Sequence, residues 1–81
     1  MLVRIYVKTK RHFPSEGYDV NEFCFINPDQ IGEILRKKRE IAIISLNTTY
    51  FVREDDESIR LVNELLPEGM TYEDMSIEGD Y

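Results

Sequence analysis

Apolar and polar residues alternate at the start of the chain, as they do in a strand that buries one face. Within residues 2–8, Val3, Ile5 and Val7 would lie on one side of such a strand, and Arg, Tyr and Lys on the other. Period-two alternation with β-branched residues is typical of a half-buried strand. The first element is therefore predicted to be a β-strand.

A loop and a second strand are predicted next. Residues 10–19 contain Pro14, Ser15 and Gly17, a composition that favours turns and loops. Residues 22–26 have the sequence Glu-Phe-Cys-Phe-Ile, in which the two phenylalanines are two positions apart. This spacing places both aromatic rings on one face of a strand.

The following stretch supports two interpretations. Asn27, Pro28 and Gln30 suit the N-cap, first-turn and capping-box positions of a helix, so at least one helical turn is predicted there. Residues 31–39 continue with apolar residues at helical spacing, but Gly32 would cost about 1 kcal/mol inside a helix. The same residues also fit a strand that turns at the lysine pair.

Residues 41–46 and 49–53 are predicted to form a β-hairpin. Both segments are rich in β-branched or aromatic residues. Asn47 and Thr48 are predicted to form the turn between them, because Asn tolerates the positive φ that a tight turn needs.

One amphipathic helix is predicted after the hairpin. The four acids at residues 54–57 favour the positive end of a helix dipole, and Asp55 or Asp56 suits the N-cap position. Pro67 ends the helix, since the residue before a proline avoids helical geometry. The apolar stripe consists of residues at helical spacing: Ile59, Leu61, Val62, Leu65 and Leu66.

These elements predict a small α+β domain over residues 1–69. An antiparallel sheet or meander of four to five strands would be followed by one C-terminal amphipathic helix. Residues 70–81 are predicted to form an acidic tail with interspersed Met, Ile and Tyr.

Composition narrows the classes of protein to which the chain can belong. It has 81 residues, a formal charge of −6 and 42% apolar residues, enough for one small domain with a modest core. The single cysteine excludes an internal disulfide framework and a cysteine-rich zinc site. No apolar run exceeds four residues, whereas a membrane-spanning helix needs roughly 20. We therefore expect a cytoplasmic protein with no membrane insertion.

A set of motifs between residues 25 and 66 resembles a known family. An Asn-x-x-x-Ile-x-x-Ile stretch (Asn27, Ile31, Ile34) precedes an alternating strand, then a tight turn, an aromatic strand ending Val-Arg-Glu (residues 50–54) and an acid-capped helix. This order is similar to that of the short flagellar-protein family FlbD (SwrD) and of small phage proteins. The resemblance implies a strand meander at residues 31–44. It also implies a non-enzymatic accessory role with no catalytic residue.

The inventory of reactive side chains is sparse. One Cys and one His allow a single nucleophile–base pair, Cys24 with His12, but Cys24 lies within a predicted strand and His12 in a basic loop. Residues 54–57 lack the alternating spacing and the glycine of a calcium loop. A chain this small is not expected to form a cleft of roughly 300 Å³ or more. We therefore predict no catalysis, no cofactor and no metal.

Charge differs between the two halves of the chain. Residues 1–40 carry a net charge of +2 and residues 41–81 a net charge of −8. Two basic runs in the first half could contact phosphates, with Tyr6 and Phe13 stacking on bases; alternatively, they are solvated strand edges and turns. The runs are Lys8, Lys10, Arg11 and His12, and Arg36, Lys37, Lys38 and Arg39.

The acidic half suggests a surface for a basic partner. Carboxylates would speed association, and Met and Tyr would anchor the contact; alternatively, Met70 and Tyr72 dock on the helix and the rest of the tail is solvated. The predicted partner-binding residues are Glu54, Asp55, Asp56, Glu57, Glu64, Tyr72, Glu73, Asp74, Met75 and Tyr81.

The predicted function is a protein–protein interaction module. It would be an accessory or regulator of a larger machine, or a phage or mobile-element inhibitor of a host factor. Its partner would be another protein, such as a basic nucleic-acid-processing one, and an exposed strand edge would also allow a homodimer. The alternative is a small nucleic-acid-binding domain that uses the two basic runs.

Overall fold

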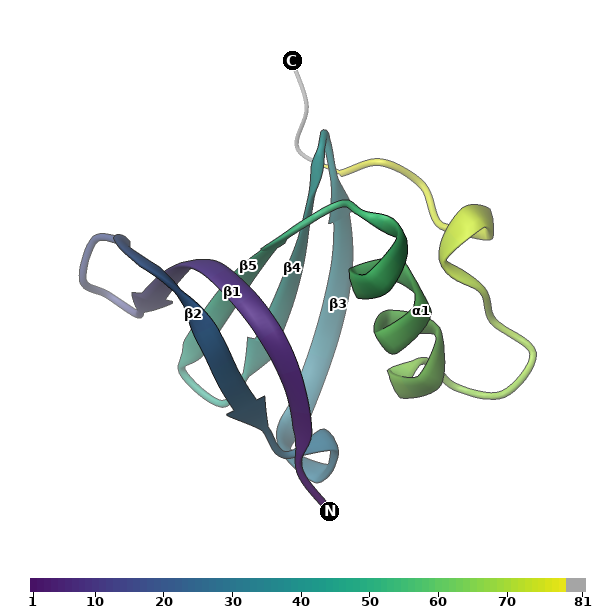
Figure 1. Ribbon diagram of the computed structural model, residues 1–81, viewed down its shortest axis with the longest axis horizontal. Coiled ribbons are helices and arrows are strands. Elements are labelled where there is room, and N and C mark those ends of the chain that lie inside the picture. The colour runs from purple at the N-terminus through teal and green to yellow at the C-terminus, as the bar shows by residue number, and fades with distance from the viewer. Residues whose placement is uncertain (79–81) are drawn as a thin grey trace.

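The computed structural model describes residues 1–78 and contains one five-stranded antiparallel sheet with one α-helix after it (Figure 1). The predicted α+β class is confirmed. The strand order is β2-β1-β5-β4-β3, so β2 and β3 are the two edges. The elements are β1 (Val3–His12), β2 (Tyr18–Ile26), β3 (Ile31–Lys37), β4 (Glu40–Ser45), β5 (Thr48–Arg53) and α1 (Asp56–Leu65), with short 3₁₀ turns at Pro28–Gln30 and Tyr72–Asp74.

The ambiguous stretch after Asn27 is a single 3₁₀ turn followed by a strand. The Asn27 side chain accepts a hydrogen bond from the Asp29 backbone N–H at 3.0 Å, which is the predicted cap. The chain then enters β3 and pairs with β4, whose other edge is paired with β5, so the backbone groups of β4 are hydrogen-bonded on both sides. The β3–β4 turn consists of Lys38 and Arg39, one residue later than predicted.

The predicted β4–β5 hairpin is present, but its turn is Leu46-Asn47, not Asn47-Thr48. The positive φ, +57°, is at Leu46. Thr48 belongs to β5 because Ser45 pairs with it across the ladder. Its hydroxyl is also hydrogen-bonded to Nδ1 of His12 at 2.9 Å, a contact with β1 that no local turn rule includes.

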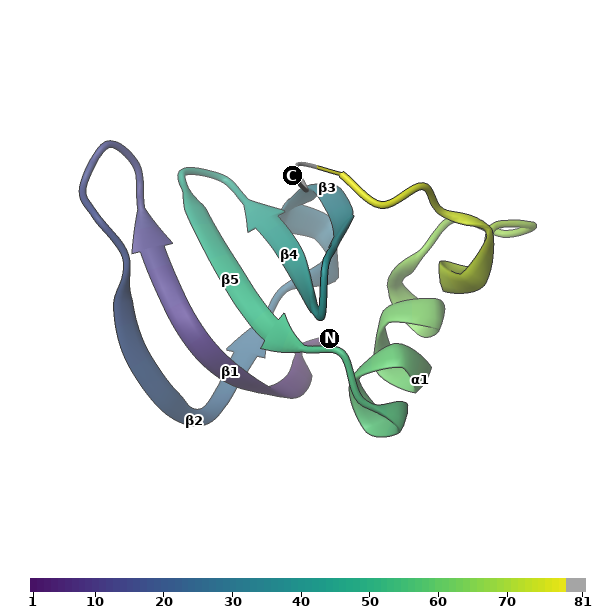
Figure 2. The same cartoon turned by 90° about the horizontal axis from the view of Figure 1, so that it is seen from above.

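Helix α1 lies against one face of the sheet and closes the core (Figure 2). It begins as predicted, with the Asp55 carboxylate accepting a hydrogen bond from the Ser58 N–H at 2.8 Å, and it ends before Pro67. Burying an aliphatic side chain contributes roughly 1.5–3 kcal/mol, so this shared core is the main source of stability. The core consists of fully buried residues from four strands, the helix and the tail: Ile5, Val7, Ile26, Ile41, Ile43, Val52, Val62 and Tyr72.

The part of the predicted tail that the structure describes packs on the domain. Tyr72 is 1% exposed, and its backbone N–H donates to the Asn63 side-chain oxygen at 2.8 Å. Further on, Ile77 pairs in parallel with Arg36 of β3, and the Glu78 N–H donates to the Arg36 carbonyl at 2.6 Å. Residues 70–78 are thus integrated with the domain, whereas Tyr81 lies outside the described residues.

No helical segment within residues 1–78 has the length and apolar character required to cross a bilayer.

The strained turn residue allows a test of the hairpin geometry. Leu46 is 72% exposed and has a φ of +57°, which costs a non-glycine residue about 1–2 kcal/mol. We expect Leu46→Gly to raise the free energy of unfolding by about 0.5–1 kcal/mol, measured by urea denaturation, because glycine adopts this φ without strain. Leu46→Ala keeps the strain and should bring no gain. Equal stabilities of the two variants would contradict the assigned turn.

Candidate functional site

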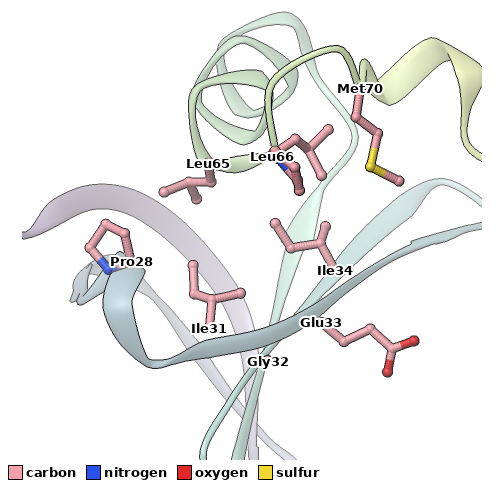
Figure 3. Close-up of a pocket in the computed structure, with 9 residues that line it drawn as sticks. Pro28, Ile31, Gly32, Glu33, Ile34, Leu65, Leu66 and Met70 are labelled. Carbon is pink, nitrogen blue, oxygen red and sulfur yellow. The ribbon is translucent and has the colours of Figure 1, made fainter.

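An apolar groove lies between edge strand β3 and the C-terminal end of α1 (Figure 3). Its volume is about 350 Å³. In Figure 3, Ile31 and Ile34 point from β3 toward Leu65 and Leu66, and Glu33 projects outward. The lining residues come from three segments of the chain: Pro28, Ile31, Gly32, Glu33, Ile34, Leu65, Leu66, Pro67 and Met70.

The groove remains open to solvent because α1 ends at Leu65 and does not extend across β3. Pro67 stops the chain from continuing over β3, and Met70 is 47% exposed at the rim. Gly32 contributes no side chain, and a Cβ atom there would come no closer than 4.0 Å to the Ile44 carbonyl. Apolar side chains therefore line a trough that solvent reaches.

A second hollow of about 300 Å³ continues along β3 and shares Glu33, Ile34 and Met70 with the groove. Asp74 and Glu78 also line it. Each of these hollows reaches the lower end of the volumes of small-molecule sites, so the expectation that this chain forms no such cleft is wrong. Partial coverage of the sheet by a short helix, which composition does not predict, leaves these hollows.

Among the described residues 1–78, Arg36 is the only basic one that lines either hollow, and its contacts are internal. Its Nη1 donates to the carbonyls of Glu73 at 3.3 Å and Met75 at 3.2 Å. Its Nε lies 3.6 Å from a carboxylate oxygen of Glu54, and the guanidinium lies 4.8 Å from the centre of the Tyr72 ring. Although Arg36 was predicted as a phosphate ligand, it connects β3, the start of α1 and the tail.

Tyr72 and Glu54 also face inward. The Tyr72 hydroxyl donates a hydrogen bond to the Glu54 carboxylate. Burial, and then this bond to an anionic acceptor, raise the pKa of the Tyr72 hydroxyl. Both residues were predicted to contact a partner, but here they stabilise the position of the tail.

The other acids of the predicted partner surface lie mainly on the outside. Asp55 caps α1, whereas Glu57 and Glu64 both form ion pairs with Arg60 on the exposed helix face. In the tail, Asp74 accepts a hydrogen bond from the Thr71 hydroxyl at 2.9 Å. Asp56, Glu73 and Asp74 are exposed, and Met75 is half-buried against the core.

The two predicted basic runs are not brought together. Arg11 and His12 pair with Thr49 and Thr48 at the start of β5, while the Lys37–Glu40 turn neighbours Arg53 at its end. Thr49 and Arg53 are four residue steps apart along β5, which corresponds to about 13 Å. The two runs therefore lie at opposite ends of β5.

An exposed aromatic cluster lies on β1 and β2, and Tyr6 is the one member to which the sequence assigned a role, stacking on bases. The Arg4 guanidinium lies 3.7 Å from the Phe23 ring centre, and Tyr6 meets the same ring edge-on with centroids 5.3 Å apart. Phe23 and Phe25 are 50% and 61% exposed. The predicted placement of both phenylalanines on one face was the signal that pointed to this cluster.

The one nucleophile–base pair that the composition allows, Cys24 with His12, is not assembled. Cys24 lies opposite Ile5, and His12 is seven residues further along β1. Burial raises the pKa of the Cys24 thiol, which disfavours the reactive thiolate. Within residues 1–78, no three His, Cys, Asp or Glu side chains are grouped as a metal site would require.

No protein-family model, curated protein or solved structure matches this chain. The resemblance of residues 25–66 to the flagellar family stays a prediction.

The Arg36 contacts generate a stability prediction. Arg36→Ala removes two charge-assisted hydrogen bonds and leaves Glu54 without its cation, so we expect a loss of about 2–3 kcal/mol in the free energy of unfolding. Arg36→Lys keeps the charge, so its loss should be smaller, although one ammonium group cannot take the place of both Nη1 at the tail carbonyls and Nε beside Glu54. Urea denaturation at neutral pH measures both. A midpoint for Arg36→Ala equal to that of the wild type would contradict this role.

The Tyr72 hydroxyl adds a dependence of stability on pH. Because its pKa is higher in the folded than in the unfolded chain, its contribution is complete below about pH 10, the ordinary tyrosine value. It declines as the pH rises above 10, since only the unfolded chain then loses the proton. We expect the stability difference between the wild type and Tyr72→Phe to shrink between pH 9.5 and 11 in denaturation experiments. A difference that stays constant over this range would contradict the raised pKa of the Tyr72 hydroxyl.

Proposed function

We propose that this chain is a non-enzymatic protein-interaction module that binds a basic segment of another protein in the groove between β3 and α1. The observation that carries the proposal is an open apolar trough with acidic surroundings. Such a trough suits a peptide segment in which large apolar side chains alternate with Lys or Arg.

Charge around the groove supports a basic partner. Glu33 lines the groove, and Glu64 and Glu68 lie on either side of its leucines in the sequence, while Asp74 and Glu78 line the adjoining hollow. Arg36, the one cation among the described residues that line the adjoining hollow, is already engaged within the chain. The local field is therefore negative, and such a field raises the association rate of a cationic segment.

The apolar lining supports affinity. Leu65 and Leu66 are half-buried, and Met70 is exposed at the rim with an unbranched, adaptable side chain. Buried apolar anchors within a polar rim usually supply most of the binding energy of a protein interface. The groove thus combines an apolar floor with charged edges that favour one class of partner.

This proposal fits the two roles considered from the sequence. A cytoplasmic accessory of a larger machine and a mobile-element inhibitor of a host factor would both act by contact. The inhibitor role would present acidic side chains to a site that ordinarily receives nucleic acid.

The test compares capture by the wild type with capture by the double variant Glu33→Lys/Met70→Lys. Each immobilised chain is incubated with nuclease-treated lysate of the source organism, and bound proteins are quantified by mass spectrometry. We expect at least one basic protein whose recovery falls about tenfold or more with the variant, equivalent to about 1.4 kcal/mol. Its capture should also weaken as the salt concentration rises.

The control variant Glu16→Lys/Tyr18→Lys makes the same charge change and replaces a side chain of similar exposure. Tyr18 is 49% exposed and Met70 47% exposed, but Glu16 and Tyr18 lie at the β2 edge of the sheet. The control should retain the partner. Equal losses with both variants, or recovery that depends on intact nucleic acid, would contradict the groove as the binding site.

A further inference from the structure

Strand β2 is an exposed edge. Within residues 1–78, β1 is its only strand neighbour, so the backbone on the other side of β2 is free to pair. Its side chains Phe23 and Phe25 are at least half exposed. Proteins usually protect a long edge strand with charges, prolines or a covering segment, because an open apolar edge pairs with other chains.

The centre of this edge reads the same in both directions, because Phe23 and Phe25 lie symmetrically about Cys24. A two-fold axis that pairs a strand with its own copy in antiparallel orientation places the residues on the two sides of the axis opposite each other, so an axis at Cys24 brings aromatic residues together. We propose that two copies of this chain pair through β2, with the axis at Cys24, and form one continuous ten-stranded sheet.

The register follows from the symmetry. Phe23 of one copy lies directly opposite Phe25 of the second copy, and the reverse pair is identical. Cross-strand aromatic pairs of this kind favour the pairing of two strands. The ladder would span residues 22–26, because Asn21 has a φ of +51° on one side and Pro28 lacks an N–H on the other.

The neighbouring strand extends each aromatic pair into a row. Within one copy, Arg4 pairs with Phe25 and Tyr6 with Phe23 across β1 and β2. Each row across the dimer therefore runs from Arg4 and Phe25 of one copy to Phe23 and Tyr6 of the second copy. Each such row has one guanidinium at its end followed by three aromatic rings, and both kinds of neighbour attract aromatic groups.

Charge favours a second copy at this edge. Residues 1–26 contain four basic and three acidic side chains, so this part of the chain is close to neutral. The acidic tail and the carboxylates of the groove lie along β3, at the opposite edge of the sheet. Pairing through β2 keeps the two acidic regions apart, whereas pairing through β3 would bring them together.

The register can be tested by exchange of charge. In Phe23→Lys and in Phe25→Glu, each homodimer loses both aromatic pairs, so each variant alone should sediment as a monomer. An equimolar mixture places Lys at position 23 of one copy opposite Glu at position 25 of the other and retains one Phe–Phe pair. The mixture should therefore form dimers again. Sedimentation equilibrium at 10–500 μM (about 0.1–5 mg/ml) with reductant present measures each state, and circular dichroism checks that each variant is folded.

Phe13→Lys is the matched control. Phe13 is 65% exposed but lies in the β1–β2 loop beyond the proposed ladder, so this variant should dimerise like the wild type. A monomeric wild type across the whole range overturns the proposal, as does a mixture that stays monomeric while the wild type dimerises. Fluorescence anisotropy with a labelled oligo(dT) tests whether this edge binds single-stranded nucleic acid instead of a second copy of the chain. Binding that requires Phe25 in a monomeric wild type would assign this face to nucleic acid.

Discussion

The arrangement of the molecule depends on a partly buried guanidinium–phenol–carboxylate cluster, in which Tyr72 is buried and the side chains of Arg36 and Glu54 are 25% and 27% exposed. Arg36 lies on the edge strand, Glu54 immediately precedes α1, and Tyr72 lies in the tail, so the cluster connects three parts of the chain. Two carbonyl groups of the tail accept hydrogen bonds from the guanidinium. Charge-assisted contacts of this kind are strong when solvent is largely excluded.

This cluster also determines the shape of the candidate groove. With Tyr72 held in the core, the preceding residues must return toward β3, which places Met70 at the rim. The tail then follows β3 as far as Ile77. The groove is formed by three segments: the β3 edge, the end of α1 and the tail. Its geometry therefore depends on the global stability of the domain.

The two edges of the sheet differ in chemistry. The β3 edge is acidic, partly occupied by the tail and next to an apolar trough. The β2 edge is aromatic, close to neutral and uncovered by any described segment. The proposed groove and the proposed dimer edge therefore lie on opposite sides of the sheet, with β1, β5 and β4 between β2 and β3.

The sequence by itself determined the elements whose rules are local. Alternation marked β1, the hairpin residues marked β4 and β5, and Asp55 with Pro67 bounded the helix, because these signals act over a few residues. The sequence left β3 undecided, since its apolar spacing fits a helix or a strand until β4 is present as a partner. Only the tertiary structure decided that Arg36 turns inward, because the groups that satisfy it lie 37 and 39 residues away and local spacing says nothing about contacts over such separations.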